Sequence, residues 1–185
     1  MQLFMSDRVI IDLGCGQDPE PGSVGVDVAV LEKVDLLADL DSEFLPFATN
    51  SVDEVYLKHV VEHLESVVDT IEELSRIVRP GGEIHIYTPH FTSRGNHADP
   101  THKHSFSYRS FDYFARESET KEWISTWYTD VELEIVEREI RFNNRRQVWN
   151  KIVRPIANKY PDIYEKTPLR IFPANELYVR LKMIE

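Results

Sequence analysis

Short apolar runs recur through the first half of the chain, and most of them stop at a glycine or an acidic residue. Runs of this length bounded by turn residues are typical of strands buried on both faces of a parallel sheet. We therefore expect strands at 8–13, 24–28, 34–38, 52–57 and 83–88.

A helix is predicted between the last two of these strands. Apolar residues recur there at three- and four-residue spacing from Val67 to Val78, with charged residues on the other face. The pattern ends at Arg79, before Pro80 and Gly81, which cannot continue a helix and which favour a turn. Strands joined by such connections predict an α/β fold with a largely parallel sheet.

The second half of the chain is less regular. Residues 131–142 read as a long strand whose alternation slips at Ile135-Val136, which predicts a bulge. Residues 176–184 form a closing strand, and we expect these last two strands to give the sheet an antiparallel edge. A long polar loop is expected at 89–110 and an extra helical segment at 143–173. The 185 residues suit a single domain, 1–185.

Composition narrows the class of protein further. The net charge of −11 disfavours general binding to nucleic acid. No apolar run reaches the roughly 20 residues that a membrane helix needs, and no signal peptide is visible. A single cysteine excludes an intrachain disulfide. We expect a cytoplasmic protein without a membrane partner.

A glycine pair and an acid mark a candidate nucleoside site. Gly14 and Gly16 follow the first strand, and Asp27 ends the second, where a carboxylate can bind both ribose hydroxyls. Asp27 follows Gly16 by only 11 residues. A dinucleotide site has about 20 residues here, because a helix whose N-terminus faces the pyrophosphate intervenes. The short spacing favours a nucleoside without phosphates.

At this point the sequence resembles the class I S-adenosylmethionine-dependent methyltransferases of the small, single-domain kind. The matching blocks are VIIDLGCG (9–16), GVDV (25–28), ADLDSEFLPFATNSVDEVYLKHVVEHL (38–64) and IEELSRIVRPGGEIHIYTP (71–89), in family-like order over about half of the chain. The chain departs from the family at Asp18-Pro19, where a third glycine or a small residue is usual.

The resemblance implies a Rossmann-like methyltransferase fold with seven strands, and S-adenosyl-L-methionine as the cofactor. Asp27 would bind the ribose, Asp39 the adenine amine, and Lys58 and His59 would lie near the reactive methyl group. We expect the Cys15 side chain to be simply small and buried. The implied cofactor-contacting residues are Asp12, Gly14, Cys15, Gly16, Asp27, Val28, Asp39, Leu40, Lys58 and His59.

The first two connections are too short for proper helices. In the resembled family, such helices cover one face of the sheet, yet the strands here read as apolar on both sides. An exposed apolar face is unfavourable, so we expect a cover. The candidates are the helix around 148–160, folded back, and a second copy of the chain in a homodimer.

The polar loop carries a cluster of histidines beside the expected methyl donor. Methyl transfer depends mainly on positioning, but a hydroxyl or amine acceptor also benefits from a base of near-neutral pKa. We predict catalytic roles for His90 first, and then for His102 or His104. The alternative is a structural role, in which the histidines of a polar loop form hydrogen bonds with backbone groups.

Two further readings stay open. His102, His104 and Asp99 could bind a metal, and His59 and His63 have helical ligand spacing, but the spacings match no named metal pattern and we favour no metal. Residues 141–159 carry a charge of +6 within an acidic chain. We favour a solvated helix face there over an anionic partner.

The sequence thus predicts S-adenosylmethionine-dependent methyl transfer to an unidentified small-molecule acceptor. One alternative is a module of the same fold that binds the cofactor without catalysis. A second is an NAD-dependent or other nucleotide-using enzyme, against which the 11-residue spacing argues.

Overall fold

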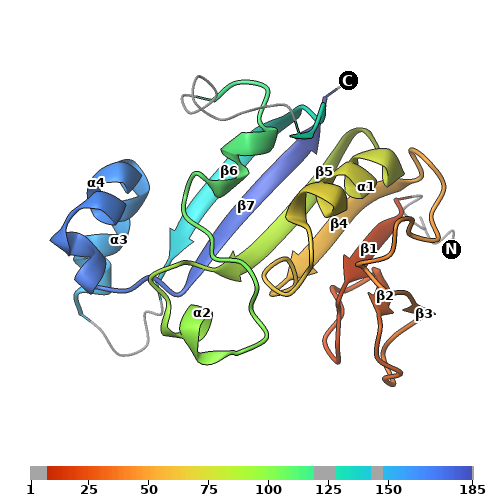
Figure 1. Ribbon diagram of the computed structural model, residues 1–185, viewed down its shortest axis with the longest axis horizontal. Helices are drawn as coiled ribbons and strands as arrows, with labels where there is room; N and C mark the ends of the chain where they lie inside the picture. The colour runs from red at the N-terminus through yellow and green to blue at the C-terminus, as the bar shows by residue number, and fades with distance from the viewer. Residues whose placement is uncertain (1–7, 119–127, 143–147, 185) are drawn as a thin grey trace, which may run out of the picture.

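A seven-stranded sheet in the order β3-β2-β1-β4-β5-β7-β6 forms the centre of the computed structural model, which describes residues 8–118, 128–142 and 148–184 (Figure 1). Strands β1 to β5 pair in parallel, and β7 runs antiparallel to both of its neighbours. The strands are β1 (Ile10–Leu13), β2 (Val24–Asp27), β3 (Leu36–Leu37), β4 (Val52–Lys58), β5 (Val78–Pro89), β6 (Leu133–Arg141) and β7 (Glu176–Met183).

The predicted mostly parallel α/β sheet is confirmed, and so is the antiparallel pair at one end. Strand β7 lies one place in from the edge, between β5 and β6. The predicted bulge is also present, because the β6–β7 register shifts between Ile135 and Glu137. Strand β5 begins at Val78, five residues earlier than expected, directly after the helix that precedes it.

Helix α1 (Val67–Ile77) occupies the predicted position and covers one face of β4 and β5 (Figure 1). The hydroxyl of Ser66 caps its start by accepting a hydrogen bond from the Asp69 N–H at 3.2 Å. Ile71, Leu74 and Ile77 are fully buried against the sheet. Because β1 pairs in parallel with both β2 and β4, the carboxyl ends of these three strands meet at one edge of the sheet.

The early connections contain turns in place of helices, as expected from their length. Residues 14–23 join β1 to β2, and residues 28–35 join β2 to β3. The face of the sheet that such helices would cover is therefore left to other parts of the chain.

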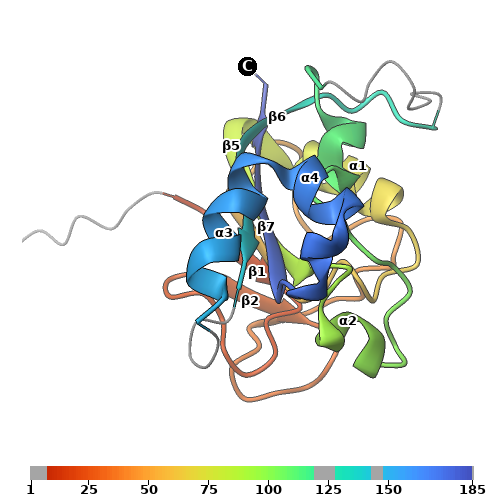
Figure 2. The ribbon, with the colours of Figure 1, turned by 90° about the vertical axis from the view of Figure 1, so that its left-hand side faces the viewer.

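The C-terminal helices pack at the far end of the sheet (Figure 2). They are α3 (Asn150–Lys159), α4 (Pro161–Lys166) and the 3-10 turn η3 (Pro168–Ile171), all within the predicted segment 143–173, of which 143–147 lie outside the described residues. Helix α3 contacts β6, at the opposite edge from β3. The expectation that this helix folds back over the early strands is wrong.

The face opposite α1 is polar and aromatic, so the expectation of strands that are apolar on both sides is also wrong. We call this surface the open face; it consists of Glu54, Tyr56, His85, Tyr87, Tyr178 and Arg180. The register explains the error. Val55 and Leu57 point toward α1, while the alternate residues Glu54 and Tyr56 point away from it.

Stacked rings and ion pairs cover the open face from within the sheet. The rings of Tyr56 and His85 stack with centroids 4.4 Å apart, and Nδ1 of His85 lies 3.1 Å from the Tyr178 hydroxyl. Arg180 forms ion pairs with Glu83 at 3.3 Å and with Glu137. Because the open face is not apolar, no second copy of the chain is needed to cover it. The homodimer stays a prediction, but an exposed apolar sheet face no longer supports it.

Two shorter elements lie beyond β5, within and after the predicted polar loop. They are helix α2 (Arg94–Ala98) and the 3-10 turn η1 (Ser110–Phe114). Phe111 and Phe114 are buried in the core. None of the described helices is long and apolar enough to cross a membrane.

Candidate functional site

The loop after β1 is held against the end of β2 by backbone hydrogen bonds. The N–H groups of Gly14 and Cys15 donate to the Val26 carbonyl at 2.8 and 3.2 Å. Gly14 has a φ of 68° and Gly16 a φ of 54°, a region in which glycine is strongly favoured. A side-chain carbon at Gly16 would meet no atom within 4 Å, so this side of the loop is open to a ligand.

Asp27 is part of the same loop in space. Its Oδ2 accepts from the Gly16 N–H at 2.9 Å, and its Oδ1 accepts from the Ala29 N–H at 2.9 Å. A carboxylate oxygen can accept more than one hydrogen bond, so both oxygens can still take ribose hydroxyls. The adjacent Val28 is 71% exposed.

Asp12 lies beneath the loop and is fully buried. Its Oδ2 is 2.9 Å from Nζ of Lys58, at the end of β4, and accepts from the Glu20 N–H at 2.7 Å. Burial raises the pKa of the Asp12 carboxyl despite these two contacts. Oδ1 has no hydrogen-bond partner. An orphaned buried acceptor beside an open glycine loop can accept a hydrogen bond from a cationic or polar group of a ligand.

The Cys15 side chain is 7% exposed, and burial raises the pKa of its thiol. Its Sγ lies so close to Gly25 that a side-chain carbon there would sit 2.9 Å away. Cys15 is the small buried residue that we expected, and only its backbone faces the loop.

Asp39 and Leu40 follow β3. Asp39 is exposed and Leu40 half-buried. Leu40 and Leu13 line a cavity of about 560 Å³ between residues 40–45 and the start of α1, whereas Asp27 is not in its wall. Six of the 14 described lining residues are acidic, among them Asp41, Glu43 and Glu65, and Arg76 is the one cation. Such a cavity suits a neutral or cationic group and repels a pyrophosphate.

His59 follows β4 with a φ of 58°, an unusual backbone conformation for a residue with a side chain. Its Nε2 lies 3.2 Å from Glu176, and its Nδ1 lies 3.4 Å from Oε1 of Glu62. Hydrogen bonding to Glu176 and then to Glu62 raises the pKa of His59 to about 9. His59 is therefore a cation at neutral pH.

An open cleft of about 700 Å³ lies beside His59. We call it the histidine cleft; its walls include His59, Glu62, His63, His102 and Glu176. The start of antiparallel β7 brings Glu176 to this edge, opposite Pro89 at the end of β5. Lys58 and His59 connect the two regions, since Lys58 contacts Asp12 under the glycine loop and His59 faces the cleft.

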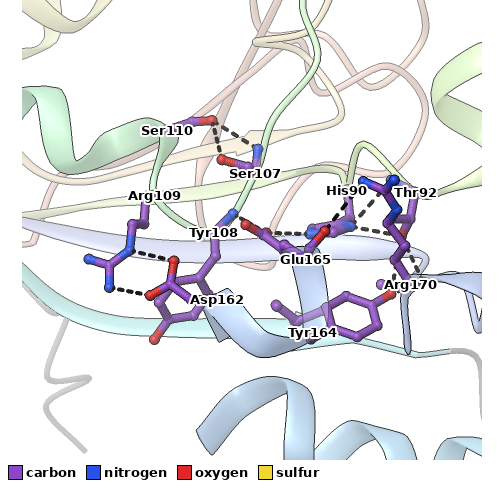
Figure 3. Close-up of polar contacts among 12 residues, drawn as sticks. His90, Thr92, Ser107, Tyr108, Arg109, Ser110, Asp162, Tyr164, Glu165 and Arg170 are labelled. Carbon is purple, nitrogen blue, oxygen red and sulfur yellow. Dashed lines mark hydrogen bonds and ion pairs between the residues drawn. The ribbon is translucent and has the colours of Figure 1, made fainter. Parts of the chain in front are cut away.

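The structure does not favour His90 as the base. His90 is fully buried, with Nε2 2.9 Å from Glu165 and Nδ1 2.8 Å from the Thr92 hydroxyl (Figure 3). The same Glu165 oxygen accepts from the Tyr108 N–H at 2.7 Å. Both ring nitrogens are thus engaged, Nε2 with Glu165 of α4 and Nδ1 with Thr92 of the loop, and neither is available to an acceptor.

The two other predicted histidines differ in position. Nε2 of His104 lies 2.9 Å from the Leu64 carbonyl, which ties the loop to the residues after β4. His102 lines the histidine cleft. Among the three predicted catalytic histidines, His102 has the position best suited to contact an acceptor.

Two of the four described cations in residues 141–159 form ion pairs with carboxylates. Arg141 pairs with Glu139 at 2.9 Å and with Glu176 at 3.1 Å, and Arg154 also pairs with Glu139. Arg145 and Arg146 lie outside the described residues. These pairs agree with the interpretation of this stretch as a solvated face.

Sequence reasoning missed three acids that the fold brings to the histidines, namely Glu62, Glu165 and Glu176. Each lies far in sequence from at least one group that it contacts. A signal existed only for Glu62, which stands in the EHL block and is fully buried.

Comparisons with known proteins agree with this geometry. Residues 15–86 match a family model described as a methyltransferase domain. No curated protein matches the chain. The match covers 72 of the 185 residues, and over this segment the chain is similar to methyltransferase domains.

Solved structures show the same fold at low identity. A methyltransferase dependent on S-adenosylmethionine from Archaeoglobus fulgidus has a TM-score of 0.54 at 20% identity, covering 95% of this chain and 86% of that one. A candidate methyltransferase from Haloferax volcanii, in complex with the Trm112 methyltransferase activator, has a TM-score of 0.58 at 16% identity. The match covers 97% of this chain and 84% of that one. The [4+2]-cyclase SpnF has a TM-score of 0.55 at 15% identity, and the match covers 96% of this chain and 75% of that one.

Proposed function

We propose that the chain transfers the methyl group of S-adenosylmethionine to a small-molecule acceptor bound in the histidine cleft. The observation that carries the proposal is the pair Lys58 and His59. One contacts Asp12 under the glycine loop, and the next lies in the cleft wall. A donor site and an acceptor site are therefore adjacent at the carboxyl edge of the sheet, where open α/β sheets bind ligands.

The chain's own residues would bind and orient the two reactants. Asp27 would accept the ribose hydroxyls, Asp12 the ammonium group, and the exposed Asp39 the adenine amine. The cofactor supplies a methyl group on a sulfonium centre. His59, as a cation bridging Glu62 and Glu176, would keep these carboxylates in place in the cleft wall.

Calorimetric titration with S-adenosylmethionine and S-adenosylhomocysteine tests the donor site. We expect micromolar binding that Asp27→Ala weakens more than about tenfold, or 1.4 kcal/mol. Glu32→Ala, at an exposed acid in the next connection, is the matched control and should bind as the wild type does. Absence of binding to the wild type would refute the proposal.

Two other functions are separated by simple outcomes. The cyclase neighbour shows that this fold serves more than one chemistry, so a module that binds S-adenosylmethionine without transferring its methyl group is the second candidate. It would bind the cofactor yet yield no methylated product from any acceptor pool. An NAD-dependent enzyme would give a thermal shift with NAD, which the acidic cavity lining disfavours.

A further inference from the structure

Two histidines and one buried carboxylate converge in the histidine cleft. Glu62, His63 and His102 each offer a ligand atom, and these three atoms lie within 4.8 Å of one another. The rings of His63 and His102 meet edge to face, with centroids 4.6 Å apart. The combination differs from the metal readings of the sequence, because it includes Glu62 and leaves out His59 and His104.

The hydrogen-bond network assigns the tautomer of His63. The Thr101 hydroxyl donates its proton to Asp99 at 2.6 Å. It must therefore accept in its contact with Nδ1 of His63, at 2.9 Å, so Nδ1 carries the proton. The lone pair of His63 is left on Nε2.

The same argument applies to His102. Its Nδ1 lies 3.2 Å from the Asn96 carbonyl, which can only accept, so Nδ1 carries the proton and Nε2 the lone pair. A histidine held by an outer hydrogen bond from one nitrogen is the usual arrangement of a metal ligand. The Asp99 carboxylate lies 3.9 Å from Nε2 of His102, beyond hydrogen-bond distance.

Glu62 supplies the third group. It is fully buried; its Oε2 accepts from the Thr88 hydroxyl at 3.0 Å, while Oε1 has no hydrogen-bond partner. The His59 imidazolium approaches Oε1 at 3.4 Å, a long ion-pair contact. A buried carboxylate oxygen with so distant a partner can still accept a shorter bond from a metal ion.

We propose that Glu62, His63 and His102 bind a divalent transition-metal ion that positions an acceptor carrying a hydroxyl group. Two imidazoles and one carboxylate suit Zn²⁺, Fe²⁺, Mn²⁺ or Co²⁺ better than Mg²⁺ or Ca²⁺, and they leave coordination positions open. The role in catalysis rests on the proposed methyl transfer. The acceptor oxygen would bond to the methyl carbon as the carbon–sulfur bond breaks, its electron pair going to sulfur and the hydroxyl proton to water.

A second cluster on the open face is a weaker candidate. Glu54, Glu83 and His85 also offer ligand atoms within 4.8 Å of one another. Their carboxylates already pair with arginines, Glu54 with Arg8 and Glu83 with Arg180. A cation there would compete with two guanidinium groups.

The test uses the full chain without a polyhistidine tag, stripped with a chelator and titrated with Co²⁺ and Zn²⁺. We expect one equivalent of Co²⁺ to give visible absorption bands, and His63→Ala and His102→Ala each to weaken binding more than about tenfold. Glu62→Gln, which keeps the side-chain shape, should do the same. His97→Ala, at an exposed histidine of the same loop, is the matched control.

The outcomes separate this proposal from the proposed function. Unchanged Co²⁺ affinity in the double variant of His63 and His102 would overturn the metal site. Thr101→Val removes the hydrogen-bond partner of His63 Nδ1. If the tautomer assignment holds, this variant should bind Co²⁺ about tenfold more weakly, or worse. Calorimetry with S-adenosylmethionine on the stripped protein reports on the donor site alone, so each proposal fails separately.

Discussion

Nζ of Lys58 lies 2.9 Å from Oδ2 of Asp12, and this ion pair joins the ends of β4 and β1 beneath the glycine loop. Asp12 is fully buried, whereas the Lys58 side chain is 28% exposed. The pair therefore compensates a charge that water cannot reach, and the glycine loop depends on it.

Lys58→Met should destabilise the protein by roughly 3 kcal/mol, because it leaves the Asp12 charge buried without its cation. Urea unfolding at neutral pH measures the loss. Lys33→Met, at an exposed lysine, is the control and should change stability by less than about 0.5 kcal/mol. Equal stability of both variants would contradict the role given to the pair.

Glu73→Gln should lower stability at neutral pH by about 2 kcal/mol. Glu73 accepts from the Leu45 N–H and from Arg76, both at 2.6 Å. Burial alone would raise the pKa of Glu73, but these contacts outweigh it and lower the pKa below its ordinary value of 4.5.

The pH dependence follows from that direction. A lowered pKa contributes stability that is fully present above the ordinary value of 4.5 and is lost as the pH falls through the folded-state pKa. The difference between wild type and Glu73→Gln should therefore be constant near neutrality and shrink below about pH 4.5. The neighbouring, exposed Glu72→Gln should give no such trend in urea unfolding across pH.

The two loop glycines should respond differently to alanine. Gly16→Ala adds only the cost of a left-handed backbone, about 1 kcal/mol, because its side-chain carbon would meet open space. Gly14→Ala would also place that carbon 2.5 Å from a methyl group of Val60, which adds roughly 1–3 kcal/mol.

Thermal or urea unfolding of both variants tests this difference. Val60→Ala should rescue part of the loss in Gly14→Ala and none of it in Gly16→Ala, because only Gly14 has Val60 as its neighbour. Equal losses at the two glycines would show that the contact with Val60 is not what distinguishes them.

His90→Ala and Glu165→Ala should each destabilise the protein by about 2 kcal/mol, since each leaves a buried partner unpaired. The double variant should lose less than the sum by at least about 0.5 kcal/mol, because both changes remove one contact. If His90→Ala left the unfolding free energy unchanged, the docking role would be wrong. The hypothesis that His90 acts as the catalytic base would then have to be reconsidered.

Much of the fold could be read from the sequence because strand ends and the long helix carry strong local signals. Pro80 and Gly81 predicted the end of α1 to within a few residues, although they lie in β5, and the slip at Ile135-Val136 located the bulge in β6. The character of the open face could not be read in the same way. The side chains of the run VDEVYLK point alternately to the two faces of the sheet. The run is apolar on average, and this average does not show that Glu54 and Tyr56 share one face.

The candidate site was predictable only in its local parts. The glycines and Asp27 lie close in sequence, so their juxtaposition follows from two neighbouring strands. The partners of His59 and His90 depend on β7 and α4, which return to this edge from the end of the chain. Such long-range pairs leave no periodic pattern, and an alternating His-rich loop looks the same whether its rings are buried or exposed.

The open face also bears on how stability varies with temperature. A sheet covered by helices on both sides buries apolar surface twice, and exposing that surface gives unfolding its large heat-capacity change. Here one side carries charged and polar groups among its aromatic rings, and the hydration of those polar groups contributes to the heat capacity with the opposite sign. The chain should therefore have a heat-capacity increment below the usual range of about 12–15 cal/mol/K per residue and a correspondingly flatter stability curve.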